Sequence, residues 1–100
     1  MNPARGEAAL TVDGAAVTLR PSFQALVAAE AELGPLFALV ERAAAGQLSL
    51  GEIATLFWHV VAGRDDALTK ERIGEAILEA GLAAVTPALR TLIAQILQGR

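Results

Sequence analysis

The residues that could support acid–base or nucleophilic chemistry are few in this sequence and lie far apart. His59 is the only histidine, and no neighbouring motif supplies the hydrogen-bonded partner that a general base needs. Ser22 and Ser49 are the only serines, and both stand where helix N-caps are expected rather than in a nucleophile-elbow sequence. We therefore predict no catalytic residue and interpret the protein as a non-enzyme.

Patterns that bind metals or cofactors are equally sparse. The chain has no cysteine, and the adjacent carboxylates Asp65 and Asp66 are too few to hold a cation by themselves. The nine glycines stand singly, so no glycine-rich phosphate loop is present. The sequence predicts neither a metal site nor a cofactor.

Two other features favour contact with another protein. Glu71, Glu75 and Glu79 recur every four residues, which places them in one acidic stripe along a helix. This stripe is either a solvated helix face or a docking face for a basic partner. Trp58 lies about 100° from the inward-facing positions of its helix, so it is either an aromatic at the margin of the core or a partner anchor.

The charge distribution argues against a nucleic acid partner. The net charge is −3, and the eight basic residues are scattered rather than gathered in a stripe. Two helices over residues 50–62 and 68–82 would fit a helix-turn-helix, but the acidic stripe on the second helix would repel phosphate. We therefore predict no nucleic acid binding.

The sequence also lacks the usual signals for a membrane or an export route. No apolar segment of a signal peptide is present at the N-terminus, and the longest apolar stretch, Leu56–Ala62, is far too short to span a bilayer. We predict no membrane partner and a cytoplasmic location. Charged residues make up 19% of the chain, below the roughly 25% of typical domains. This low charge content favours an exposed apolar surface that binds a partner.

The elements that must position these residues begin with a β-hairpin. We expect one domain over residues 1–100, with a flexible arm at 1–6, a hairpin at 7–20 and helices over 22–98. Asp13-Gly14 is a strong signal for a two-residue type I′ turn. The turn sets a register that pairs Ala8 with Leu19, Leu10 with Val17 and Val12 with Ala15, all on one apolar face. The other face carries Glu7, Thr11, Thr18 and Arg20, with Ala9 and Ala16.

Five short helices are predicted after the hairpin, so the fold class is α+β, mainly α, with the hairpin packed on the helices. Their expected spans are about 22–33, 35–45, 50–62, 70–80 and 87–98. Ser22, Ser49 and Thr69 are the predicted N-caps, and Ser49 with Glu52 forms a capping box. Thr86-Pro87 is expected to open the last helix, with Thr86 as its cap.

The last helix carries more apolar residues than one buried stripe requires. These residues are Leu89, Leu92, Ile93, Ile96 and Leu97. In a domain this small, a helix buries one stripe against the core, and here Leu92 and Leu97 widen that stripe. We therefore predict that part of this face is exposed or covered by another copy of the chain, and that it binds protein.

Many weakly specific positions together resemble the gene-transfer-agent family of small phage tail proteins. The matching stretches are Gly6-Glu7-Ala8, Leu10 to Gly14, Thr18-Leu19-Arg20, Phe23-Gln24-Ala25-Leu26, Glu30, Leu33-Gly34 and Ser49-Leu50-Gly51-Glu52-Ile53. The resemblance covers about residues 5–62, and beyond Gly63 only the pattern of helices is alike. The family is described as tail tube or tail-assembly chaperone proteins.

The resemblance implies a role in building a phage-like tail. It points to a tail-assembly chaperone that binds tail tube or tape-measure proteins, in a bacterial cytoplasm or in a tail particle. One alternative is a structural subunit of the tail tube, which would be present in purified particles. A less favoured alternative is a small DNA-binding or antitoxin-like regulator. A second copy of the chain is a further candidate partner, which would make the protein a homo-oligomer.

Overall fold

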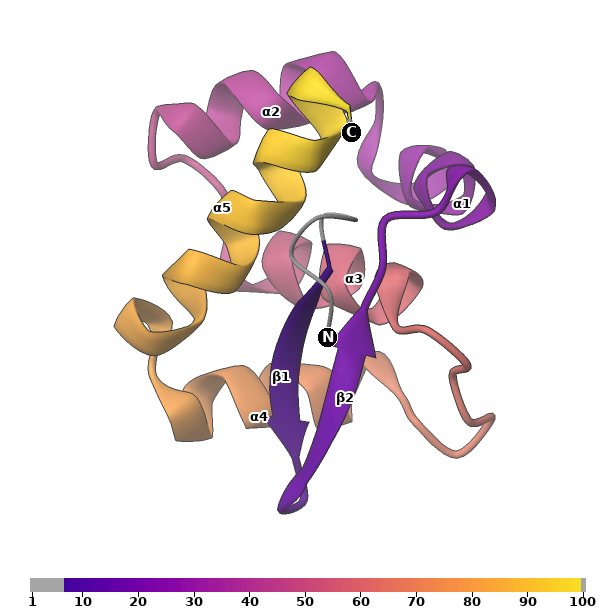
Figure 1. Cartoon of the computed structure of the whole chain (residues 1–100). Coiled ribbons are helices and arrows are strands. Elements are labelled where there is room, and N and C mark those ends of the chain that lie inside the picture. Colours follow the sequence, from indigo (N-terminus) through magenta and orange to yellow (C-terminus); the bar gives the residue numbers. More distant parts are fainter. Residues whose placement is uncertain (1–6, 100) are drawn as a thin grey trace.

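A two-stranded antiparallel sheet followed by five helices makes up residues 7–99, which are the residues described by the computed structural model (Figure 1). The strands are β1 (Ala8–Val12) and β2 (Ala15–Leu19). The helices are α1 (Phe23–Leu33), α2 (Leu36–Ala44), α3 (Leu50–Val60), α4 (Lys70–Ala80) and α5 (Leu82–Gln98). This arrangement confirms the predicted α+β, mainly α fold. The arm predicted for residues 1–6 lies outside the described residues.

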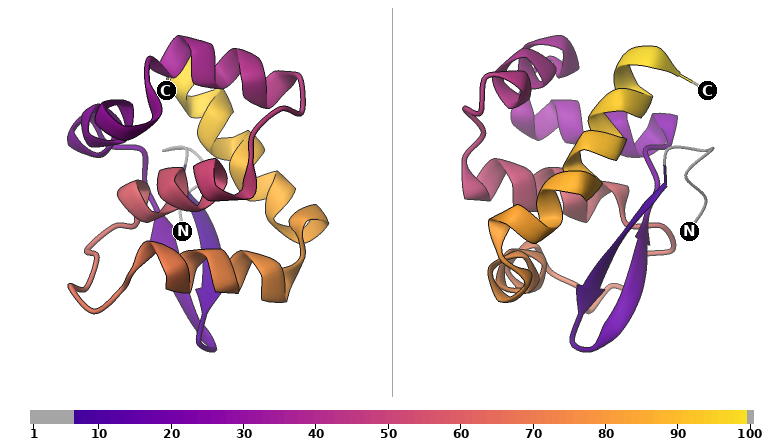
Figure 2. Two further views of the ribbon diagram at one scale, coloured as in Figure 1. Left: turned by 180° about the vertical axis from the view of Figure 1, so that it is seen from behind. Right: turned by 60° about the vertical axis from the view of Figure 1, so that its left-hand side comes forward.

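The hairpin has the turn and the register that its sequence predicts. Asp13 and Gly14 have φ angles of 52° and 80°, in the left-handed region that a type I′ turn requires. The strand register pairs Ala8 with Leu19, Leu10 with Val17 and Val12 with Ala15. Strand β1 packs on α4 and α5, and the turn projects beyond α4 (Figure 2). The helices thus supply the cover that an isolated hairpin lacks.

One residue of the hairpin differs from its predicted environment. The register places Glu7 on the face opposite the apolar one, yet Glu7 is only 4% exposed. Its Oε2 atom accepts from Nε of Arg20 at 2.5 Å. A buried carboxylate requires such a charged partner, so the ion pair explains how Glu7 is accommodated.

Helix α3 lies at the centre of the molecule and ends by joining the sheet. The Arg20 N–H donates to the Val60 carbonyl at 2.6 Å, and the Ala62 N–H donates to the Thr18 carbonyl at 2.8 Å. Val61 therefore adopts an extended conformation and forms an antiparallel bridge with Leu19. The predicted end of this helix at about residue 62 is two residues too late, because these hydrogen bonds pull the backbone into an extended conformation.

The side-chain caps predicted at Ser22, Ser49 and Thr69 are confirmed. Ser22 accepts from the Ala25 N–H and Thr69 from the Arg72 N–H, each at 3.2 Å. Ser49 accepts from the Glu52 N–H, while the Glu52 carboxylate accepts from the Ser49 N–H at 3.0 Å, which completes the capping box. Helix α2 is one residue shorter at each end than the predicted span of 35–45.

Helix α5 begins earlier than its local signals predict. It starts at Leu82 rather than after Thr86, and Pro87 lies inside it. Gly81, with φ of 92°, closes α4 by donating to the Ile77 carbonyl at 2.8 Å, and α5 follows directly. The Thr86 hydroxyl does not cap the helix but donates to the Leu82 carbonyl at 2.8 Å. Burial of Val85, which is 5% exposed, keeps the extra first turn helical despite the proline.

Every strand and helix contributes to one hydrophobic core. The largest fully buried side chains are Phe57, Leu19, Leu39, Leu56, Ile73, Ile77, Leu92 and Val60. This shared core over residues 7–99 supports the single domain expected for residues 1–100, which stays a prediction.

Candidate protein interaction surface

An open apolar groove lies between α2, the start of α3 and the C-terminal half of α5; we call it the α2–α5 groove. It has a volume of about 610 Å³. The apolar side chains that line it from α5 are Leu89, Ile93, Ala94 and Leu97, and those from α2, α3 and the loop between them are Ala43, Ala44, Leu48 and Ile53. Three of the residues predicted for protein binding are thus brought together on one concave surface.

The helical repeat explains why α5 has two distinct apolar faces. Leu89, Ile93 and Leu97 are spaced by four residues, so their side chains follow one another along the groove. Val85 and Leu92 are spaced by seven residues and face the core. Leu92 is 0% exposed, so its predicted place on an exposed binding face is wrong. Leu97 is 56% exposed, whereas Ile96 is half-buried and does not line the groove.

The groove has one unpaired cation on its rim. Within residues 7–99, Arg20, Arg42, Lys70 and Arg72 pair with carboxylates, and Arg64 stacks on Trp58. Arg90 lines the groove, is exposed, and has neither kind of partner among the described residues. The groove is therefore an apolar surface with one positive charge available to an incoming group.

The C-terminal part of the acidic stripe lies on a second surface, which we call the α4–α5 corner and define by Glu75, Leu78, Glu79 and Leu82. The three glutamates of the stripe are exposed, and none forms an ion pair within the described part of the chain. Leu78 and Leu82 beside them are 61% and 52% exposed. The corner thus combines negative charge with two protruding apolar side chains.

Arg72 compensates only part of this negative charge. Its guanidinium pairs with Asp13 at the hairpin turn, and this contact is the main reason why the pKa of Arg72 is raised. The negative fields of Glu75 and Glu79 raise that pKa further. Arg72 is thus directed toward the hairpin, and the outer side of the corner remains acidic.

A comparison with protein families identifies the group to which these surfaces belong. Residues 5–99 match the family described as "Phage tail tube protein, GTA-gp10". The chain belongs to this family. No curated protein and no solved structure matches the chain.

Membership in this tail tube family supports a structural role in a phage-like tail. The match extends well beyond residues 5–62, where the sequence resemblance is strongest, and it includes α4 and α5. Both the groove and the corner therefore lie within the region shared with the family.

In this tail tube family member, Trp58 makes its contacts within the chain. Its Nε1–H donates to the Leu68 carbonyl at 2.8 Å, and the Arg64 guanidinium lies 3.6 Å from the ring centroid. Trp58 also packs against the core and is half-buried. These contacts are those of an aromatic side chain at the margin of the core. A role of Trp58 in anchoring a partner stays a prediction.

A polar cluster that the sequence did not reveal joins three helices. Nε2 of His59 on α3 lies 2.6 Å from Oε1 of Glu32 on α1, and the Nζ of Lys70 on α4 binds the other oxygen of that carboxylate. The contact with Lys70, followed by that with His59, lowers the pKa of Glu32. Because Glu32 is 27 residues from His59, no local motif could have indicated the pair.

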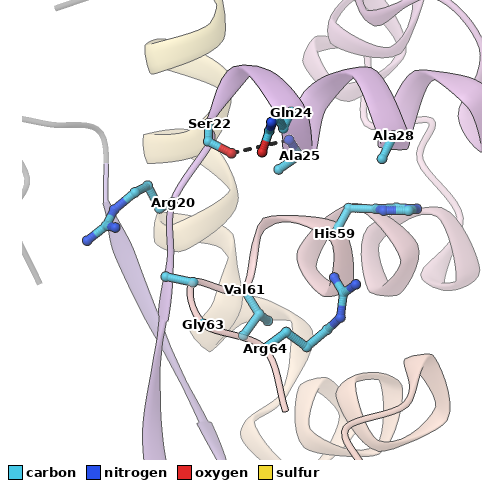
Figure 3. A pocket seen from close by; sticks show the side chains of 10 residues that line it. Arg20, Ser22, Gln24, Ala25, Ala28, His59, Val61, Gly63 and Arg64 are labelled. Carbon is cyan, nitrogen blue, oxygen red and sulfur yellow. Dashed lines mark hydrogen bonds between the residues drawn. The ribbon is translucent and has the colours of Figure 1, made fainter. Parts of the chain in front are cut away.

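His59 also lines a pocket of about 380 Å³ (Figure 3). Ser22 lines it, but its hydroxyl already accepts from the Ala25 N–H. Arg64 lies beside His59, and Arg20 directs its guanidinium away from the pocket. Nε2 of His59 contacts Glu32 rather than Ser22, so these two residues do not form a nucleophile–base pair in this structure.

Two further findings concern residues 7–99. No group of three His, Cys, Asp or Glu side chains in this part of the chain is placed to hold a metal ion. No single helix there is long and apolar enough to cross a membrane, although the bent pairs α1–α2 and α4–α5 reach the required length and composition.

Proposed function

We propose that this protein is a tail-assembly chaperone that binds a tail tube or tape-measure protein in the α2–α5 groove. The observation that carries the proposal is the apolar wall of Leu89, Ile93 and Leu97 along the open groove, in which Leu97 is 56% exposed and the other two side chains are half-buried. Grooves between helices are a common docking site for amphipathic helices of partner proteins. Covering such a wall removes apolar area from water, which favours binding by about 25 cal/mol per Å² before ordering costs.

A second candidate function is that of a structural subunit retained in the tail tube. The description of the family as a tail tube protein favours it. The two functions differ in where the protein ends up, because a subunit remains in purified particles and a chaperone is left behind in the bacterial cytoplasm. Mass spectrometry of purified tail particles distinguishes them.

The exposed acidic stripe makes a regulator that binds nucleic acid the weakest of the functions considered. Glu71, Glu75 and Glu79 face solvent without ion-pair partners in the described chain, and phosphate would be repelled by them. No nucleic acid and no membrane are needed in the proposed assembly role.

The test is capture of tail proteins from a lysate that produces particles, with Leu97→Glu compared with the natural sequence. Leu97 is exposed, so the variant is expected to fold while it places a charge in the groove. We expect recovery of the tail tube or tape-measure protein to fall by about tenfold or more. The matched control is Val27→Glu, which makes the same kind of change at an apolar position of α1 that is 48% exposed. Equal recovery with Leu97→Glu and the natural sequence would contradict the proposal.

A further inference from the structure

The two surfaces described above lie at opposite ends of one helix. Leu82 belongs to the α4–α5 corner and Leu97 to the groove, and they stand in the first and last turns of α5. At 1.5 Å per residue they are about 22 Å apart along the helix axis. Figure 1 shows the corner at the N-terminal end of α5 and helix α2 beside its C-terminal end. A contact between these surfaces within one molecule is therefore impossible, but a contact between two molecules is not.

The chemistry of the two surfaces is complementary. The corner presents Leu78 and Leu82 as protruding apolar side chains, and the groove offers an apolar hollow of about 610 Å³. The corner also carries acidic side chains without ion-pair partners, and the groove rim carries Arg90, the one described basic residue without a carboxylate or aromatic partner. Each surface thus supplies the charge and the shape that the other lacks.

We propose that the α4–α5 corner of one copy docks in the α2–α5 groove of a second copy, so that the copies associate head to tail. Leu78 and Leu82 of one copy lie against the wall formed by Leu89, Ile93 and Leu97 of the next. Glu75 or Glu79 pairs with Arg90 at the rim. Because the contact joins two different surfaces, each copy keeps one surface for a further neighbour, and the association continues into a ring or a filament.

A symmetric dimer through two grooves fits the same observations less well. It would bring the Arg90 side chains of both copies to one interface, and it would leave the glutamates of both corners unpaired. Like charges at an interface cost free energy, whereas the head-to-tail contact pairs opposite charges. The charge distribution therefore favours the corner of a second copy as the occupant.

This inference rests on the proposed function in that both assign protein binding to the groove. In an open row of copies, the groove of the last copy remains free, and a tail protein would bind there. The two uses of the groove have different readouts, which are the mass of the purified protein and the capture of tail proteins.

The experiment is sedimentation velocity of the purified full chain over a range of concentrations. We expect the mass of the natural protein to rise with concentration, and the association to weaken as salt is added. Leu78→Glu on the corner and Leu97→Glu in the groove should each weaken self-association by about tenfold or more. Val27→Glu on α1 is the matched control and should associate like the natural protein.

Mixing the two variants gives the decisive measurement. Leu78→Glu keeps an intact groove and Leu97→Glu keeps an intact corner, so the mixture has one working interface. We expect a one-to-one complex that grows no further. A mixture that stays monomeric, while the natural protein associates, would overturn the head-to-tail arrangement.

A charge reversal keeps the proposal testable even if Leu78→Glu fails to fold. Arg90→Glu should weaken association, and mixing it with Glu79→Arg should restore it. A natural protein that stays monomeric at its highest soluble concentration would overturn the inference. If Leu97→Glu still lost tail proteins in that case, the proposed function would stand. If copies associated as described but captured no tail protein, only the proposed function would fail.

Discussion

Helices α3 and α5 are both rich in apolar residues, yet they use them in different ways. Helix α3 buries Ala54, Leu56, Phe57 and Val60 and is fixed at both ends, by a capping box at its start and by the bridge to β2 at its end. Helix α5 is longer, but only Val85 and Leu92 are buried, and no side chain caps its start. Of its other large apolar residues, Leu89, Ile93 and Leu97 line the groove and Leu82 belongs to the corner.

The difference shows how the molecule separates stability from binding. The buried side chains of α3 lose nearly all contact with water, so they contribute transfer free energy and close packing to the folded state. The groove face of α5 leaves apolar area in water, and that area is available for a partner. The same kind of residue therefore has a different consequence on the two helices, and substitutions can measure it.

The largest effect is expected at Phe57 on α3. Phe57 is 0% exposed, and Phe57→Ala should lower the free energy of unfolding by about 3–5 kcal/mol through lost burial and a cavity. Urea unfolding followed by the fluorescence of Trp58, the only tryptophan, measures it. The matched control is Phe37→Ala at a position that is 73% exposed, where a change within about 0.5 kcal/mol is expected. Similar losses of unfolding free energy for Phe57→Ala and Phe37→Ala would show that burial does not set the contribution of these side chains to stability.

Within α5, substitutions on the core face and on the groove face should also differ in their effect on the free energy of unfolding, by a smaller amount. Leu92→Ala should lower the free energy of unfolding by about 2–5 kcal/mol, because Leu92 is 0% exposed. Leu97→Ala removes the same atoms at a position that is 56% exposed, so its effect should stay within about 0.5 kcal/mol. The two urea midpoints provide the comparison. A larger loss for Leu97→Ala than for Leu92→Ala would mean that α5 packs with its other face inward.

The faces of α5 could not be assigned from the sequence, although its apolar character could. Five apolar side chains over residues 89–97 cover so wide an arc that the pattern alone does not say which part meets the core. The neighbouring helices decide this, since α2 lies beside the Leu97 side and leaves a groove there. The start of the helix was missed for a related reason, because burial of Val85 outweighs the local Thr86-Pro87 signal.

The hairpin and the caps were predictable because their rules act over few residues. The Asp13-Gly14 turn fixes the register of the whole hairpin, and Ser49 with Glu52 satisfies backbone groups only three residues away. The contact between Glu32 and His59 and the bridge at Val61 join segments far apart in the chain. Their partners are set by tertiary packing, about which spacing within a single element carries no information.

A moderate effect is expected at the fixed start of α3. Ser49→Ala removes the hydroxyl that accepts from the Glu52 N–H and should cost about 1 kcal/mol of stability. Ser49→Asp is the matched control, because aspartate is also a favourable N-cap and should retain most of the stability. Thermal unfolding of the three proteins measures the effect. Equal stability for Ser49→Ala and the natural protein would mean that the start of α3 is no better fixed than that of α5.

The smallest effect concerns the carboxylate that ties the end of α3 to α1 and α4. Glu32 contacts Lys70 and His59, and these contacts hold its pKa below the ordinary value of 4.5. A lowered pKa in the folded state means that the ionised form stabilises the fold. This contribution is therefore complete above pH 4.5 and is lost as the pH falls through the lowered pKa. Its size should be small, because the carboxylate is exposed to solvent.

Comparing the natural protein with Glu32→Gln isolates this contribution. The difference in their urea midpoints should be present at neutral pH and should close as the solution is acidified below pH 4.5. Glu41→Gln on α2 is the matched control, since Glu41 is exposed and forms no ion pair among the described residues. Helix α5 has no ion pair in the described chain, so acid should loosen the end of α3 without a matching change along α5. A difference that persists unchanged in acid would show that Glu32 stabilises the fold through packing rather than through its charge.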